Sequence, residues 1–175
     1  MPASIAYAAL LRAVNVGGTG RLPMTELARL CEREGLCDVK TYIQSGNVVF
    51  TSAKKEAAVK AALEKALERH MGKPVAVMVR TVDELEAVVA ANPFPEAPPN
   101  RLLVTFFDEP LSKTALAGVE APGGERLKIN GRELFIHYPD GMGTSKLKVP
   151  LLKKQGTGRN LNTVVKLAAM TRALA

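Results

Sequence analysis

The chain has 175 residues, which suffices for one ordinary domain or two small ones. Its composition of 47% hydrophobic and 23% charged residues excludes a disordered, collagen-like or coiled-coil protein. Cys31 and Cys37 are too few for a disulfide framework or a four-ligand zinc site, so we expect a reducing cytoplasm and no metal. The longest apolar run near the start, residues 5–11, predicts neither a signal peptide nor a membrane span.

The net charge of +7 is concentrated at the end of the chain. Residues 126–175 hold ten basic and two acidic side chains, whereas residues 1–125 are nearly balanced, with 14 basic and 15 acidic. This asymmetry indicates an anionic partner, such as the phosphate groups of a small molecule, a nucleic acid or an acidic protein surface. A basic solvated surface that keeps the protein soluble is the alternative.

The first eighty residues have the predicted order strand, helix, strand, strand, helix, strand. The run at 5–11 is apolar without alternation, which is typical of a strand covered on both faces. Pro23 suits the first turn of a helix that Gly35 closes, and Ser52 suits the cap of the second helix. The other strands are expected at 39–44, 48–50 and 75–79. This order is the split βαβ arrangement of ferredoxin-like domains.

A proline-rich segment divides the chain. Thr81 and Glu84 predict a capping box for a third helix, which ends at Asn92-Pro93. Residues 92–100 contain four prolines and no periodicity, so they are expected to be extended. We therefore expect an N-terminal subdomain with a linking helix at 1–92, a linker at 93–100 and a basic C-terminal subdomain at 101–175.

The second half partly repeats the first. We expect a strand at 102–107, a short helix at 111–117, a helix start at Thr144 or Ser145, and a final helix after residue 160. A hairpin is expected to turn at Asn130-Gly131, because this pair favours the positive φ that such turns need. The predicted fold class is α+β, with two ferredoxin-like subdomains joined by the proline-rich segment. A single mixed sheet is the alternative.

The loop from Arg12 to Arg21 is the first candidate ligand-binding segment. Gly17 and Gly18, with Gly20, lack the Cβ atoms that would keep an anion away from the backbone N–H groups. Arg12 and Asn15 can add side-chain donors. A tight loop that needs glycine only for its conformation is the alternative.

The remaining candidate residues are polar or basic and lie at predicted turns and helix starts. They are Gln44, Ser45, Asn47, Ser145, Lys146, Thr157, Arg159 and Asn160. The alternatives are a turn role for the first three, a solvated basic helix for the next two, and a helix cap for Thr157 or Asn160. Arg159 beside a helix N-terminus is unfavourable unless an anion or carboxylate offsets its charge.

The sequence identifies no catalytic residues. It has no Ser/His/Asp order, no metal-ligand spacing and no isolated carboxylate pair. His70 ends an amphipathic helix and His137 alternates within a hairpin strand, so both have structural explanations. Whether the protein is an enzyme, and which cofactor it would use, are left open.

Several motifs resemble the bacterial family catalogued as domain of unknown function 1697, in the same order along the chain. They are Leu10-Leu-Arg-Ala-Val-Asn-Val-Gly-Gly18, Leu22-Pro-Met-Thr-Glu-Leu27, Thr41-Tyr-Ile-Gln-Ser-Gly-Asn-Val-Val-Phe50, Asn92-Pro-Phe94 and Gly158-Arg-Asn-Leu-Asn-Thr163. The resemblance implies a soluble bacterial α+β protein with ferredoxin-like subdomains and no established activity. Members usually have glycine in place of Ala13 and tryptophan in place of Leu161, while Arg12, Asn15, Arg159 and Asn160 match the family pattern.

The functional hypothesis is a binding domain for an anionic, phosphate-bearing small ligand, held in a cleft between these loops. Arg12 and Arg159 would neutralise charge, and backbone and amide donors would orient the ligand. One alternative is binding of a nucleic-acid phosphate backbone by the basic C-terminal region. The other is a protein-interaction module.

Overall fold

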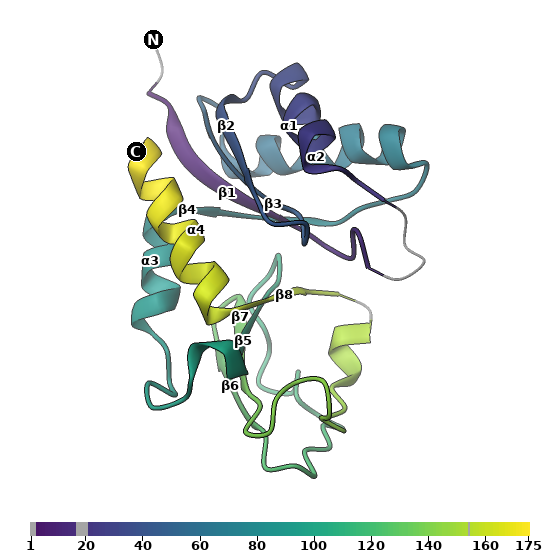
Figure 1. Cartoon of the computed structure of the whole chain (residues 1–175), viewed down its shortest axis with the longest axis vertical. Coiled ribbons are helices and arrows are strands. Elements are labelled where there is room, and N and C mark those ends of the chain that lie inside the picture. Colours follow the sequence, from purple (N-terminus) through teal and green to yellow (C-terminus); the bar gives the residue numbers. More distant parts are fainter. Residues whose placement is uncertain (1–2, 17–20, 154) are drawn as a thin grey trace. The chain divides into compact units, whose positions relative to one another are not determined.

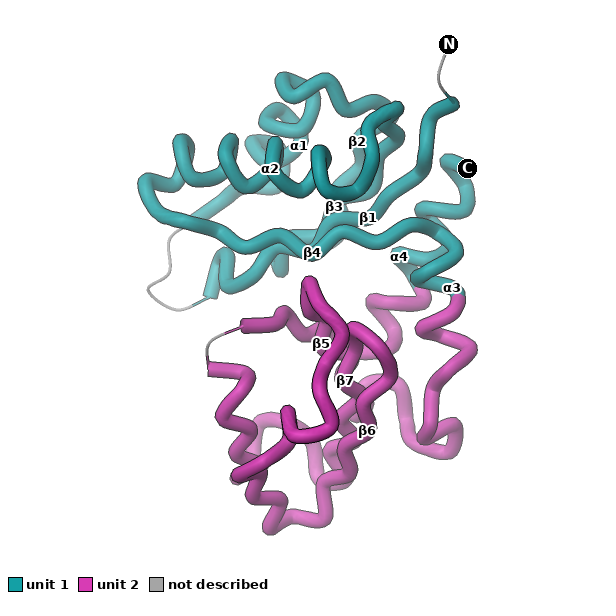
Figure 2. Tube along the Cα trace, turned by 180° about the vertical axis from the view of Figure 1, so that it is seen from behind, with its two compact units in different colours: residues 1–86, 166–175 teal, residues 87–165 magenta. Residues whose placement is uncertain are grey.

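The computed structural model describes residues 3–16, 21–153 and 155–175, and its fold is α+β with two four-stranded antiparallel sheets (Figure 1). The chain forms two compact units, of which unit 1 is Met1–Glu86 with Lys166–Ala175 and unit 2 is Ala87–Val165 (Figure 2). The α+β prediction is confirmed, and the alternative of one mixed sheet is not what the chain forms. Residues 166–175 belong to unit 1, which differs from the expected subdomain at 101–175, because the last helix continues from unit 2 into unit 1.

Unit 1 has the predicted order of elements. They are β1 (Ile5–Leu11), α1 (Met24–Arg33), β2 (Cys37–Tyr42), β3 (Asn47–Ser52), α2 (Glu56–Met71) and β4 (Val77–Thr81). The strand order in the sheet is β2-β3-β1-β4, with antiparallel neighbours throughout. Tyr7, Ala9 and Leu11 alternate along β1 into a core shared with both helices, which cover one face of the sheet (Figure 1).

The helices of unit 1 begin as their local sequences dictate, with one exception. Pro23 is the cap residue of α1, where its missing N–H leaves no donor unpaired. Ser52 does not cap α2, because β3 continues through Ser52 and the helix cap is Lys55. The Ser52 hydroxyl instead accepts a hydrogen bond of 3.1 Å from the Lys54 N–H.

Two further helices, α3 (Val82–Ala90) and α4 (Leu161–Leu174), are joined to each other by side-chain contacts within unit 1. The predicted capping box at the start of α3 is confirmed, since the Thr81 N–H donates to the Glu84 carboxylate at 2.9 Å and the Glu84 N–H donates to the Thr81 hydroxyl at 3.3 Å. Helix α4 returns to this helix through Arg172, which bonds Glu86 at 2.5 Å and Asp83 at 3.2 Å. This ion-pair network ties the last turn of α4 to the first two turns of α3.

Unit 2 repeats the connectivity of unit 1 with its helices reduced. Its elements are η1 (Pro99–Arg101), β5 (Leu102–Phe106), β6 (Arg126–Asn130), β7 (Glu133–His137), η2 (Pro150–Lys153) and β8 (Thr157–Asn160). The sheet order β6-β7-β5-β8 is that of β2-β3-β1-β4, and all neighbours are antiparallel. Leu134 and Ile136 of β7, and Tyr138 directly after it, belong to the core of this unit.

The predictions of a helix at 111–117 and of a helix start at Thr144 or Ser145, both in unit 2, are wrong. Residues 111–117 form turns with i to i+3 bonds, such as Ala115 N–H to Ser112 C=O at 3.1 Å, because so short a segment cannot offset the cost of helix nucleation. Thr144 and Ser145 likewise start no helix. The hairpin is confirmed, but its central residues are Gly131 and Arg132, and only Gly131 has positive φ, at 59°.

None of the helices in the described ranges is both long and apolar enough to cross a membrane.

Candidate functional site

The loop after β1 and the turn between β2 and β3 are joined in unit 1. The Leu11 N–H donates to the Gly46 C=O at 2.8 Å, and the buried side chain of Val14 packs against Gly46. Asn15 completes the connection, because its amide N–H groups donate to Leu22 C=O and Gln44 C=O, both at 2.8 Å. The first two predicted ligand-binding segments therefore meet.

Three residues in this region hold a left-handed backbone without being glycine. Ala13 and Asn15 each have φ of 56°, and Ile43 has φ of 48°. Asparagine tolerates this conformation, whereas a β-branched isoleucine does so only under strain. The surrounding packing therefore imposes the shape of the loop and of the turn.

The predicted polar side chains of this region are mostly used by the protein itself. The Asn15 carbonyl oxygen accepts from the Leu22 N–H at 2.7 Å, and the buried Asn47 amide donates to Tyr42 C=O at 3.0 Å and to the Ser45 hydroxyl at 2.9 Å. Arg12 is half-buried and Gln44 is exposed, while Gly17, Gly18 and Gly20 lie outside the described residues. The turn role thus accounts for Asn15, Ser45 and Asn47, and a binding role stays a prediction.

The predicted residues Thr157, Arg159 and Asn160 belong to unit 2 and lie in strand β8. Arg159 is 7% exposed, and its guanidinium donates to the Thr157 hydroxyl at 2.6 Å and to Gly158 C=O at 2.9 Å. Burial lowers the pKa of Arg159 to about 10. Asn160 caps α4 by accepting from the Thr163 N–H at 3.0 Å, which confirms the cap alternative.

The motif Asn92-Pro-Phe94 anchors a small cluster in unit 2. The Asn92 side chain accepts from the Phe94 N–H at 2.9 Å, and the buried Phe94 ring lies 4.4 Å below the Arg126 guanidinium. Arg126 also bonds His137 Nδ1 and the Glu96 carboxylate, and the latter bond lowers the pKa of Glu96. These contacts give the motif and His137 a structural role.

Sequence reasoning missed a basic hollow on the surface of unit 1. The hollow has a volume of about 330 Å³ and is lined by Leu30, Arg33, Glu34, Ala66, Arg69 and His70. Leu30 and Ala66 are buried, and the three basic side chains are exposed. Arg33 and His70 are 37 positions apart in the chain, so no local spacing signals this grouping; only the packing of α1 against α2 creates it.

A second hollow, of about 190 Å³, lies among the loops of unit 2 and contains the predicted residues Ser145 and Lys146. Its other lining residues are Pro122, Gly123, Glu125, Tyr138, Pro139, Asp140, Gly141 and Thr144. The Ser145 hydroxyl donates to the Glu125 carboxylate at 2.8 Å. Two carboxylates against one ammonium group make this hollow a poor place for an anion.

The described residues contain no group of three His, Cys, Asp or Glu side chains placed to hold a metal ion. Both cysteines are free thiols, with Cys31 buried and Cys37 exposed. Burial raises the pKa of Cys31 to about 12, which keeps this thiol protonated and unreactive.

Comparison with known proteins places the chain in a family. A solved structure described as the conserved bacterial protein SP0830 from Streptococcus pneumoniae is similar, with a TM-score of 0.78 and 26% sequence identity over 97% of this chain and 99% of that one. A search of curated proteins found no match. The family model described as "Protein of unknown function (DUF1697)" matches residues 5–135. With three quarters of its length inside that model, the chain belongs to this family.

Proposed function

We propose that this protein binds a small anionic, phosphate-bearing ligand, and that the hollow between α1 and α2 is its site. The observation that carries the proposal is the convergence of Arg33, Arg69 and His70 on one concave surface. Guanidinium groups present several N–H donors in a fixed fork that matches the oxygens of a phosphate. The volume of about 330 Å³ is within the range of small-molecule sites.

Among the side chains that line this hollow, two arginines, Arg33 and Arg69, stand against one carboxylate, Glu34. Arg69 lies 3.5 Å from Glu34, and His70 lies 4.0 Å from Glu26, so each has one acidic neighbour. Arg33 makes no ion pair or side-chain hydrogen bond within the described part of the chain. Basic residues in the last turns also suit the dipoles of both helices, but the dipoles alone do not require them to share a hollow.

The proposal is tested by binding measurements with inorganic phosphate, pyrophosphate, nucleotides and phosphorylated sugars. We expect Arg33→Ala to weaken phosphate binding by about 1–2 kcal/mol, or roughly five- to thirtyfold, since unit charges 4 Å apart interact by ~1–4 kcal/mol near a protein surface. Lys65→Ala is the matched control, because it removes the same charge from α2 outside the hollow. Equal losses in both variants would mean that only the net charge matters.

Two further arms separate this site from the other hypotheses. If Arg12→Ala weakens phosphate binding and Arg33→Ala does not, the ligand is held by the loop after β1, as the sequence predicts. A response that grows with the length of an oligonucleotide and falls steeply with salt would instead favour nucleic-acid binding. The burial of every residue of β3 gives no support to binding by base stacking on that strand.

A further inference from the structure

The hollow of unit 2 contains a buried carboxylate, Glu125, that pairs with no basic side chain in the described part of the chain. Glu125 is 8% exposed, and its two oxygens accept hydrogen bonds of 2.8 Å from the Ser145 hydroxyl and from the Gly123 N–H. Hydrogen bonding from its own backbone N–H, then from Ser145 and Gly123, lowers the pKa of Glu125, so the side chain is ionised at neutral pH. A carboxylate has about four lone-pair sites, so these donors do not exhaust its capacity to accept hydrogen bonds.

The basic residues nearby do not pair with this carboxylate. Within residues 3–16, 21–153 and 155–175, Glu125 makes no ion pair. Lys146 lines the hollow but is exposed, and Lys148 lies 3.9 Å from Glu120. Charged side chains are rarely buried without a partner, because the loss of hydration is then uncompensated.

A second polar group of the hollow is also available. Tyr138 is 7% exposed and its ring packs in the core of unit 2, yet its hydroxyl makes no hydrogen bond to any described residue. Burial, and then the charge of Glu125, raise the pKa of Tyr138, so the phenol stays neutral and can both donate and accept. The hollow thus offers a fixed carboxylate and a free hydroxyl.

We propose that this hollow binds a small molecule through a primary ammonium group, which donates to the Glu125 carboxylate and to the Tyr138 hydroxyl. Its volume of about 190 Å³ equals roughly six water molecules, which suits a short amine or a small amino acid. Pro122, Pro139 and the Tyr138 ring supply apolar surface for the carbon chain. Calcium would need six to eight oxygen ligands, more than the two carboxylates here supply.

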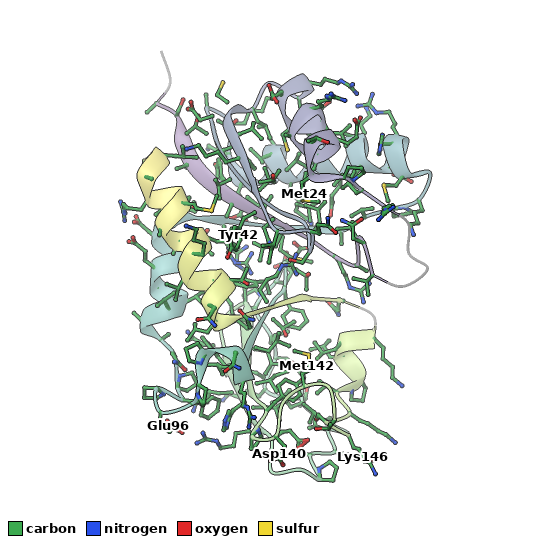
Figure 3. All side chains as sticks on the ribbon, viewed as in Figure 1. Met24, Tyr42, Glu96, Asp140, Met142 and Lys146 are labelled. Atoms are coloured by element: carbon green, nitrogen blue, oxygen red, sulfur yellow. The ribbon has the colours of Figure 1, made fainter. Side chains whose placement is uncertain are left out.

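The rim of the hollow decides between two sources of the ammonium group. Asp140 and Lys146 both line it, and Figure 3 shows them on the same side of unit 2. Lys146 would pair with the carboxylate of an amino acid, whereas Asp140 would pair with the second ammonium group of a diamine. The ammonium contact with Glu125 is common to both.

The test is a titration of the full chain with propylamine, putrescine and L-alanine, followed by the backbone amide NMR signals. We expect saturable shifts at Gly123 and Ser145, and roughly tenfold or greater weakening in Glu125→Gln, since a charge-assisted bond becomes a neutral one. Glu120→Gln is the matched control, because it removes an exposed carboxylate of unit 2 that does not line the hollow. If the occupant is an amino acid, Lys146→Ala should weaken the binding of L-alanine and of no other probe. If the occupant is a diamine, Lys146→Ala should leave the binding of L-alanine unchanged.

Four outcomes would overturn the proposal. The first is the absence of any saturable shift with the amines, and the second is an affinity for propylamine in Glu125→Gln equal to that of the unmodified chain. The third is a response to tetramethylammonium, which has no N–H donor, as large as the response to propylamine. The fourth is a saturable response of the same amides to Ca²⁺ or Mg²⁺ but to no amine. If Glu125→Gln does not fold, Tyr138→Phe serves in its place. This variant keeps the ring in the core and should weaken propylamine roughly threefold to tenfold, and unchanged affinity would count against the site.

Discussion

Replacing Gly46 by alanine tests whether the loop after β1 and the hairpin turn are locked together by close packing. Gly46 has φ of 90°, and a Cβ atom there would lie 2.6 Å from Val14 Cγ2 and 3.0 Å from Leu11 Cβ. The left-handed backbone costs an alanine about 1–2 kcal/mol. Forcing a methyl group into a packed contact adds about 1–3 kcal/mol, so Gly46→Ala should lower the free energy of unfolding by about 2–5 kcal/mol.

Gly35 provides the matched control. It has φ of 83°, but a Cβ atom there meets nothing within 4 Å. Gly35→Ala should therefore lower the free energy of unfolding only by the cost of the left-handed backbone, about 1–2 kcal/mol. The effect of alanine on the entropy of the unfolded chain is the same in both variants and cancels in the difference. Urea denaturation followed by circular dichroism gives both values.

The contact with Val14 can be isolated further. Val14→Ala removes the Cγ2 atom that the new methyl group would strike, so the loss caused by Gly46→Ala should be smaller in the Val14→Ala background by about 1–2 kcal/mol. Equal losses for Gly46→Ala and Gly35→Ala, or full additivity in the double variant, would refute the view that this packing determines the shape of the loop.

Three other changes have definite expected outcomes. Ala13→Gly should raise the free energy of unfolding by about 0.5–1 kcal/mol in urea denaturation, because the residue has φ of 56°; a loss of stability would contradict this strain. Thr105→Val should raise the free energy of unfolding by about 1–2 kcal/mol in the same assay, because the buried Thr105 hydroxyl has no hydrogen-bond partner in the described structure and valine has the same shape. No gain in stability would mean that the hydroxyl does have a hydrogen-bond partner. A thiol reagent at pH 8 should modify only Cys37 in the native protein and both cysteines after unfolding, because Cys31 is buried. The free energy of unfolding should fall as the pH rises from about 9 toward 12, because burial raises the pKa of Cys31 to about 12 in the folded protein. Rapid native modification of Cys31 would contradict its burial.

The candidate site residues show how far local patterns reach. The capping box of Thr81 and Glu84 follows from spacing alone, and the structure confirms it. For the last helix the sequence leaves Thr157 and Asn160 as alternative caps, and the structure shows that Asn160 is the cap. Asn15 and Asn47 attract attention as polar residues in loops, but residue type does not reveal whether an amide bonds a ligand or the neighbouring backbone. Their partners, Gln44 C=O and Tyr42 C=O, depend on how the turn folds.

The helical segments of unit 2 were over-predicted for a related reason. The apolar spacing at 111–117 suits a helix, yet a segment of this length needs a large packing surface to remain helical. In unit 1 the longer helices α1 and α2 have that surface, because they share the core with one face of the sheet. The same strand order thus supports two helices in one unit and mainly turns in the other.

Alternation, capping residues and turn residues along the chain were sufficient to predict an α+β protein, the order of elements in unit 1 and the hairpin of unit 2, because these features depend on neighbours a few residues apart. The two hollows required the folded chain. Arg33 meets Arg69 and His70 only through helix packing, and Ser145 meets Glu125 only where its loop folds back onto the open end of the β6–β7 hairpin. Contacts between residues distant in sequence carry no local signature, so the placement of charge in a concave surface emerges only when long-range packing is complete.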